Sequence, residues 1–255
     1  MPKVKMFNCL EVKNETPTSA DLYFYGDIVS DWWGAWQEED QYPEAIKNFL
    51  SAQQGKSLNI YINSGGGSVF AGIAIYNMIR RFAETNTVQI YVDGLAGSIA
   101  SVIAFAGNTP PKIPSNAFLM IHNPYALIEG NAAELRKMAD DLEVITGGIL
   151  NVYMEHVKEG ITEGQISALM EAETWMTGQD AAEYFNIETT ESVAEIAAAA
   201  GGYIARSKNM PKDLVIQRAA GAAKNKTSDS QDAREAELIQ NRKRDEIARI
   251  IINSL

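Results

Sequence analysis

The sequence predicts an α/β fold in which most strands of the central sheet are parallel. Two apolar runs, at 57–63 (SLNIYIN) and 88–92 (VQIYV), are rich in β-branched and aromatic residues, as buried strands are. Each run is followed by a tight turn of small residues, SGGGS or DGLAGS, and then by a segment with helical spacing, at 69–83 or 99–107. Because strands that alternate with helices are joined by right-handed crossovers, these strands are expected to lie parallel. A third strand is predicted at 117–122 (AFLMIH).

The segments on either side of this core predict further elements. Residues 21–29 favour a strand, and 43–54 a helix that begins at Pro43 and ends before Gly55. Residues 162–185 predict a helix, an extended ETWMT segment and a second short helix.

The longest helix is predicted at 131–157, where Asn131 and Glu134 form a capping pattern. Its apolar residues recur in steps of three and four: Leu135, Met138, Leu142, Ile145, Ile149 and Val152. Such a seam packs on its own domain or pairs with another subunit, and we favour pairing. The glycines at 147 and 148 indicate a close approach or a break. His156 continues the seam and is interpreted as a helix-face or interface residue.

Composition limits the function classes. The chain has 255 residues, 46% of them hydrophobic, and a formal net charge of −11, which argues against a nucleic-acid partner. No apolar run approaches the roughly 20 residues of a membrane span, and the first residues do not resemble a secretory signal, so we expect a cytoplasmic protein. One cysteine, Cys9, and two histidines predict no disulfide, structural metal or cofactor.

Three segments carry residues suited to chemistry. Gly65, Gly66 and Gly67 follow a strand, and because they lack the residues of a nucleotide-binding loop, we interpret their bare amides as oxyanion donors. Ser98 lies at the start of a helix and is either a nucleophile or only an N-cap, and Ser101 is expected on the helix flank. His122 ends a predicted strand before Asn123-Pro124 and is either a general base or a structural histidine.

Four motifs in this order resemble the Clp protease proteolytic subunit family of serine peptidases: INSGGGSVFAGIAIYN, DGLAGSIASVIAFAGN, NAFLMIHNP and ETWMTGQDAAEYF. The resemblance covers about residues 20–190 and is closest to the phage and prophage head-maturation branch. It implies a crotonase-like fold of repeated β-β-α units with a protruding handle helix. The expected organisation is an N-terminal segment at 1–19, a peptidase domain at 20–191, and a linker with a helical or disordered tail at 192–255.

The resemblance also implies roles for individual residues. Ser98 would be the nucleophile, His122 the general base, and the amides of Gly67 and Ile99 the oxyanion hole. Glu173 stands where the family has the aspartate of the triad, with Glu171, Asp140 and Asp180 as alternatives. Gly65-Gly66-Gly67 replaces the Pro-Gly-Gly that is common in the family.

The implied partners are a peptide or unfolded protein substrate and further copies of the chain, in a heptameric ring or double ring. Capsid or scaffold precursors, or an ATPase unfoldase, are further expected partners. Two other functions stay open: an acyl-CoA enzyme of the crotonase type, and a structural ring component with a weakened triad.

Overall fold

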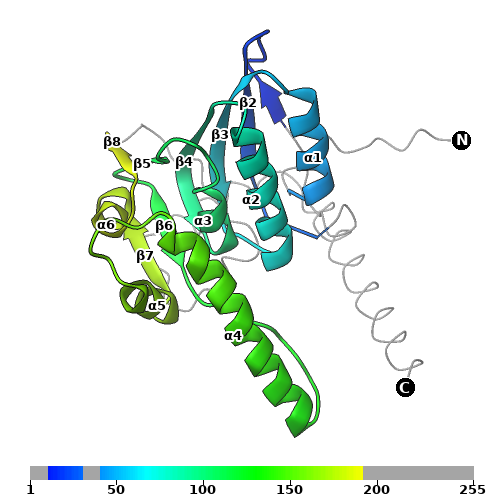
Figure 1. Ribbon diagram of the computed structural model, residues 1–255, viewed down its shortest axis with the longest axis vertical. Coiled ribbons are helices and arrows are strands. Elements are labelled where there is room, and N and C mark those ends of the chain that lie inside the picture. The colour runs from blue at the N-terminus through cyan, green and yellow to red at the C-terminus, as the bar shows by residue number, and fades with distance from the viewer. Residues whose placement is uncertain (1–10, 31–40, 192–255) are drawn as a thin grey trace, which may run out of the picture. The chain divides into compact units, whose positions relative to one another are not determined.

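The computed structural model describes residues 11–30 and 41–191, which belong to the unit Met1–Met210 (Figure 1). The predicted tail at 192–255 lies outside these residues. The strands are β1 Glu11–Lys13, β2 Ser19–Tyr25, β3 Ser57–Ser64, β4 Val88–Gly97, β5 Lys112–Pro114, β6 Phe118–Ile121, β7 Thr174–Thr177 and β8 Glu188–Thr190. The helices are α1 Pro43–Ala52, α2 Val69–Ala83, α3 Ile99–Ile103, α4 Ala132–Met154, α5 Glu163–Glu171 and α6 Gly178–Tyr184.

The strands form one mixed sheet in the order β1-β2-β3-β4-β5-β8, and β6 bridges β4 to β7. The pairs β2·β3, β3·β4, β4·β5, β5·β8 and β4·β6 are parallel, whereas β1·β2 and β6·β7 are antiparallel. The predicted α/β class with a mostly parallel sheet is therefore confirmed.

The two faces of the sheet differ in what covers them. Helices α1 and α2 lie on one face (Figure 1), where the alternate residues Ile60, Ile62 and Ile90 are fully buried. The other face carries a row of partly exposed tyrosines: Tyr23 stacks on Tyr61 with ring centroids 4.9 Å apart, and Tyr61 stacks on Tyr91 at 5.0 Å.

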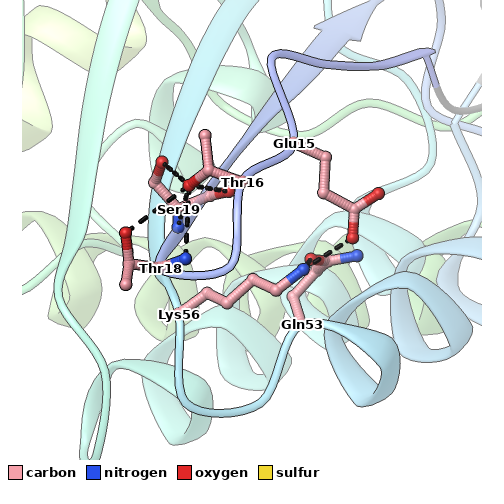
Figure 2. A network of polar contacts seen from close by, with 6 residues as sticks. All are labelled: Glu15, Thr16, Thr18, Ser19, Gln53 and Lys56. Carbon is pink, nitrogen blue, oxygen red and sulfur yellow. Dashed lines mark hydrogen bonds and ion pairs between the residues drawn. The ribbon is translucent and has the colours of Figure 1, made fainter.

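A polar network secures the turn between β1 and β2 (Figure 2). The hydroxyl of Thr16 accepts hydrogen bonds from the amides of Thr18 and Ser19, at 3.2 and 2.9 Å. Lys56, after α1, forms an ion pair with Glu15 at 2.6 Å and also donates to Gln53. The start of β2 is thereby tied to the segment that leads into its parallel neighbour β3.

Two predictions in the second β-turn-α unit are wrong in extent. Residues 93–97 were expected to form a turn, but they continue β4 to Gly97, and residues 95–97 pair with β6. Small side chains here permit this pairing, and a register shift between Ile62 and Ser64 allows Ser64 to pair with Ala96 on the other side. Helix α3 ends at Ile103 instead of 107, so it is a short connection within the core.

The capped helices were predicted well. Asn131 and Glu134 form a complete capping box at the start of α4, and Thr162 and Thr177 do the same for α5 and α6. Helix α4 runs through Gly147 and Gly148 without a break, and its first half projects from the sheet (Figure 1). Of the seam residues, Ile149 is buried but Leu135 is 46% exposed. Within the described residues, the end of the seam nearer the sheet is therefore covered and its outer end is exposed.

Candidate active site

The candidate site lies where three neighbouring strands end. Strands β3, β4 and β6 are parallel, so their carboxyl ends meet at one edge of the sheet. The chain continues from them into Gly65-Gly66-Gly67, Ser98 and His122, respectively. The topology therefore brings together three segments that were singled out from the sequence.

Ser98 and His122 are in direct contact. Nε2 of the imidazole lies 2.7 Å from the Ser98 hydroxyl oxygen, and both residues are partly buried. The amide of Ser98 donates to the carbonyl of Met120 at 2.8 Å, so β6, the strand that His122 follows, also fixes the backbone of the serine. The distance between the hydroxyl and the imidazole is within the range for proton transfer between a nucleophile and a base.

Ser98 adopts a backbone conformation that is rare for a residue with a side chain. It has φ 53° and ψ −127°, at the position between the end of β4 and the start of α3. Although Ser98 is the N-cap residue of α3, its side chain makes no capping hydrogen bond. Within the described residues, the hydroxyl thus contacts the histidine and leaves the helix uncapped, which argues against the interpretation of Ser98 as only an N-cap.

The glycine loop packs directly against this turn. A Cβ on Gly66 would lie 2.7 Å from both the Ser98 Cβ and the Gly97 carbonyl oxygen, so only glycine fits there. The carbonyl of Gly66 accepts from the Ile28 amide, and the Ser68 amide donates to the Ile28 carbonyl. These two hydrogen bonds form a parallel β-bridge between Ile28 and Gly67, in which the Gly67 amide points away from Ile28.

Two backbone amides are available as donors. In the described part of the chain, neither the Gly67 amide nor the Ile99 amide donates to another protein group. Ile99 is the first residue of α3, where amides have no partner within the helix. Both amides flank the Ser98 turn, and this arrangement suits the binding of a developing oxyanion.

The register of β6 and β7 indicates the position of Glu173 relative to His122. Strand β7 pairs antiparallel with β6, with Ile121 opposite Thr174, so the next position of the ladder sets His122 opposite Glu173. Glu173 has φ 50° and follows α5, and its amide donates to Met170, whose carbonyl also accepts from Asn123.

The alternative acids are placed differently. The Asp180 carboxylate accepts from the amide and the hydroxyl of Thr177, at 3.0 and 2.7 Å, and so completes the capping box of α6. Asp140 lies on the exposed part of α4, and Glu171 is exposed at the end of α5. Of the four carboxylates, only Glu173 is aligned with His122 by the β6·β7 register.

A small apolar pocket adjoins the serine. Its lining consists of Val69, Ser98, Ile99, Val102, His122, Pro124, Ile149 and Tyr153. Helix α4 contributes two of these residues near its carboxyl end, so the long helix forms part of the wall of the site. Among the described residues, no group of three or more His, Cys, Asp or Glu side chains is placed to hold a metal ion.

Sequence reasoning missed two neighbours of the nucleophile. Ser101 was expected on the helix flank, but it is fully buried, and its hydroxyl lies 2.7 Å from that of Tyr153. Its spacing of three residues from Ser98 was a usable signal, because a serine in a helix can bond to the carbonyl one turn earlier. The sequence contained no comparable signal for Tyr153.

The second histidine, His156, is not among the residues that line the pocket beside Ser98. His156 follows α4, stacks on Phe105 with ring centroids 5.0 Å apart, and lies 3.4 Å from the Tyr76 hydroxyl. Burial lowers the pKa of His156, and the nearby positive charge of Arg80 lowers it further. Its packing is that of a structural residue.

A parallel α/β sheet with a serine-histidine pair at the carboxyl ends of its strands is an arrangement typical of hydrolases that use a serine nucleophile. The sequence profile of the Clp protease family matches residues 39–189, and the chain therefore belongs to the Clp protease family.

Curated relatives agree with this assignment. The chain is 32% identical over 140 residues to an ATP-dependent Clp protease proteolytic subunit of Bacteroides fragilis, a match that covers 54% of this chain and 65% of that protein. It is 32% identical over 154 residues to subunit 3 of Streptomyces coelicolor, with 59% and 69% covered, and 35% identical over 155 residues to subunit 2 of Rhodococcus jostii, with 60% and 76% covered. The chain thus spans slightly less than two thirds of the Bacteroides protein. None of the described helices is long and apolar enough to cross a lipid bilayer.

Proposed function

We propose that this protein is a serine endopeptidase that cleaves peptide bonds through an acyl-enzyme. The observation that carries the proposal is the 2.7 Å contact between the Ser98 hydroxyl and Nε2 of His122 beside two available amides. The same contact favours a peptidase over an acyl-CoA enzyme, which needs the two amides but no serine-histidine pair. It also argues against a purely structural role.

The acylation step follows from the geometry. Nε2 of His122 takes the hydroxyl proton while the Ser98 oxygen attacks the peptide carbonyl carbon, and the amides of Gly67 and Ile99 bind the oxyanion. His122 then gives that proton to the leaving amine, the peptide bond breaks, and an ester to Ser98 remains.

Deacylation repeats these steps with water. His122 takes a proton from the water molecule that attacks the ester, and then returns a proton to the Ser98 oxygen as the acid product leaves. Glu173, opposite His122 by register, would orient the imidazole so that Nε2 faces the serine. A glutamate can serve here as an aspartate does.

Peptide hydrolysis tests this mechanism. Wild-type protein should cleave a fluorogenic peptide, and Ser98→Ala and His122→Ala should each lose nearly all turnover while they keep the wild-type melting temperature. Glu173→Gln should lower kcat more than it raises KM, because it alters the orientation of the base and leaves substrate contacts in place. Turnover by Ser98→Ala at the wild-type rate would refute the assignment.

We further propose that the protein acts as a homo-oligomeric ring, heptameric or double, in which α4 contacts another copy. The support is the apolar seam of α4, where Leu135 is 46% exposed in the isolated chain. Light scattering should give the mass of a ring, and Leu135→Asp should reduce it without unfolding the chain. Asn48→Asp, an equal charge change on the exposed side of α1, should have no effect. A wild-type monomer at micromolar concentration would contradict the proposal.

The substrate class that we propose is flexible segments of scaffold or capsid precursors, supported by the resemblance of the motifs to the phage branch. Incubation with a tailed-phage scaffold protein should yield fragments that are absent with Ser98→Ala. The names of the relatives support an alternative, in which an ATPase supplies unfolded chains. Cleavage of a folded protein only with a Clp ATPase and ATP, and no cleavage of the scaffold protein alone, would favour that alternative.

A further inference from the structure

The hydroxyl groups of Tyr153 and Ser101 form a chain of hydrogen bonds that ends at the backbone carbonyl of Ser98. The Ser101 hydroxyl donates to the carbonyl oxygen of Ser98 at 2.5 Å, and the Tyr153 hydroxyl lies 2.7 Å from the Ser101 hydroxyl. The Ser101 amide also bonds to the Ser98 carbonyl, at 3.0 Å. One residue of α3 thus holds the carbonyl of the nucleophile by both its amide and its side chain.

The direction of these hydrogen bonds follows from the donor count. A carbonyl oxygen can only accept, so the single hydroxyl proton of Ser101 is used in the bond to Ser98. Tyr153 must therefore donate its own proton to the Ser101 oxygen. Burial raises the pKa of the Tyr153 hydroxyl, which keeps this donor protonated.

The Tyr153 ring is held firmly in place. It is 1% exposed and packs against Phe105 and Phe185, with ring centroids 6.3 and 5.9 Å away. It belongs to α4, whose outer half projects from the sheet, and it also lines the pocket beside Ser98. The series of hydroxyls therefore connects α4 to the backbone of the nucleophile.

We propose that Ser101 and Tyr153 are positioning residues that hold Ser98 in its reactive conformation, an inference that rests on the proposed function. Ser98 has φ 53°, which a side-chain-bearing residue keeps only when its surroundings enforce it. The bonds from Ser101 fix the orientation of the Ser98 carbonyl, and hence the turn that directs the hydroxyl to His122.

The test is the rate at which a fluorophosphonate labels the full-length protein, resolved into the maximal rate of inactivation and the probe's binding constant. Tyr153→Phe and Ser101→Ala should each lower the maximal rate about fivefold to tenfold and leave the binding constant unchanged, because each removes one hydrogen bond and no pocket wall. The double variant should be no slower than Ser101→Ala alone, because that change already disconnects Tyr153.

Tyr76→Phe is the matched control. Tyr76 is also buried, and its hydroxyl contacts His156 away from Ser98, so this variant should label at the wild-type rate. If Tyr153→Phe does not fold, Ser101→Ala decides alone.

The outcomes separate this inference from the function on which it rests. A folded variant that labels at the wild-type rate, or additive losses in the double variant, would overturn the positioning role alone. A wild-type protein that takes up no label would overturn the proposed function, and this inference with it.

Discussion

Gly66 shows how closely the residues around the nucleophile are fitted. Its φ is 98°, and a Cβ added there would lie only 2.7 Å from the Ser98 Cβ, so an alanine must displace the nucleophile turn. Gly66→Ala should therefore abolish peptide hydrolysis. Gly55→Ala is the control, because Gly55 also has a positive φ, 82°, but has open space where a Cβ would lie.

In the control, Gly55→Ala, the free energy of unfolding should fall by about 1–2 kcal/mol, because alanine is strained at a positive φ. Its peptidase activity should be unchanged. Thermal melts and peptide turnover of the two variants measure this difference. Equal activity in both would show that the glycine loop is not fitted to the serine as described.

His156 makes stability depend on pH. Its pKa is lowered in the folded protein, so the unfolded chain binds more protons as the pH falls below about 6.5, and the folded state is destabilised. We expect His156→Gln to have a lower melting temperature than the wild type at pH 8. The difference between the two melting temperatures should become smaller between pH 6.5 and 5. Melting curves over this range test the sign, and a difference that grows on acidification would contradict it.

Single residues were predicted unevenly from the sequence. Ser98 and His122 lie in contact, because each stands at the end of a strand that the apolar pattern predicted. Glu173 was named only from the resemblance to the Clp protease family, and the β6·β7 register aligns it with His122. Ser101 and Tyr153 were not recognised, because a hydroxyl inside a helix gives the same pattern whether it faces solvent or a buried carbonyl.

Among the helices and strands, α4 allows a test of whether its apolar seam pairs with another subunit. A Cβ on Gly147 would contact nothing within 4 Å in this chain. Gly147→Ala should therefore raise the free energy of unfolding by about 0.5–1 kcal/mol through helix propensity alone, measurable by denaturant titration. A loss of assembly in this variant would show instead that the glycine allows close approach of another subunit.

Elements with strong local signals were predicted with nearly their observed limits. Helix α2 matches its predicted range, and the capping box of α4 begins where Asn131 and Glu134 indicated. Strand β4 was predicted too short, because DGLAGS has the composition of a turn and only pairing with β3 and β6 makes it extended. The propensities of neighbouring residues carry no information about pairing with strands that are distant in the sequence.

In the molecule as a whole, the common direction of the parallel strands determines where the candidate site forms. The sheet gathers the glycine loop, the serine and the histidine because β3, β4 and β6 run in the same direction and end together. The sequence could predict parallel strands from the alternation of strands and helices, but not that β6 pairs with β4. That pairing sets the distance between Ser98 and His122.

Mass spectrometry that locates a fluorophosphonate adduct tests whether Ser98 is the nucleophile. We expect one adduct per wild-type chain, on the peptide that contains Ser98, and none in Ser98→Ala. An adduct on any other residue, or one that persists in Ser98→Ala, would show that Ser98 is not the nucleophile.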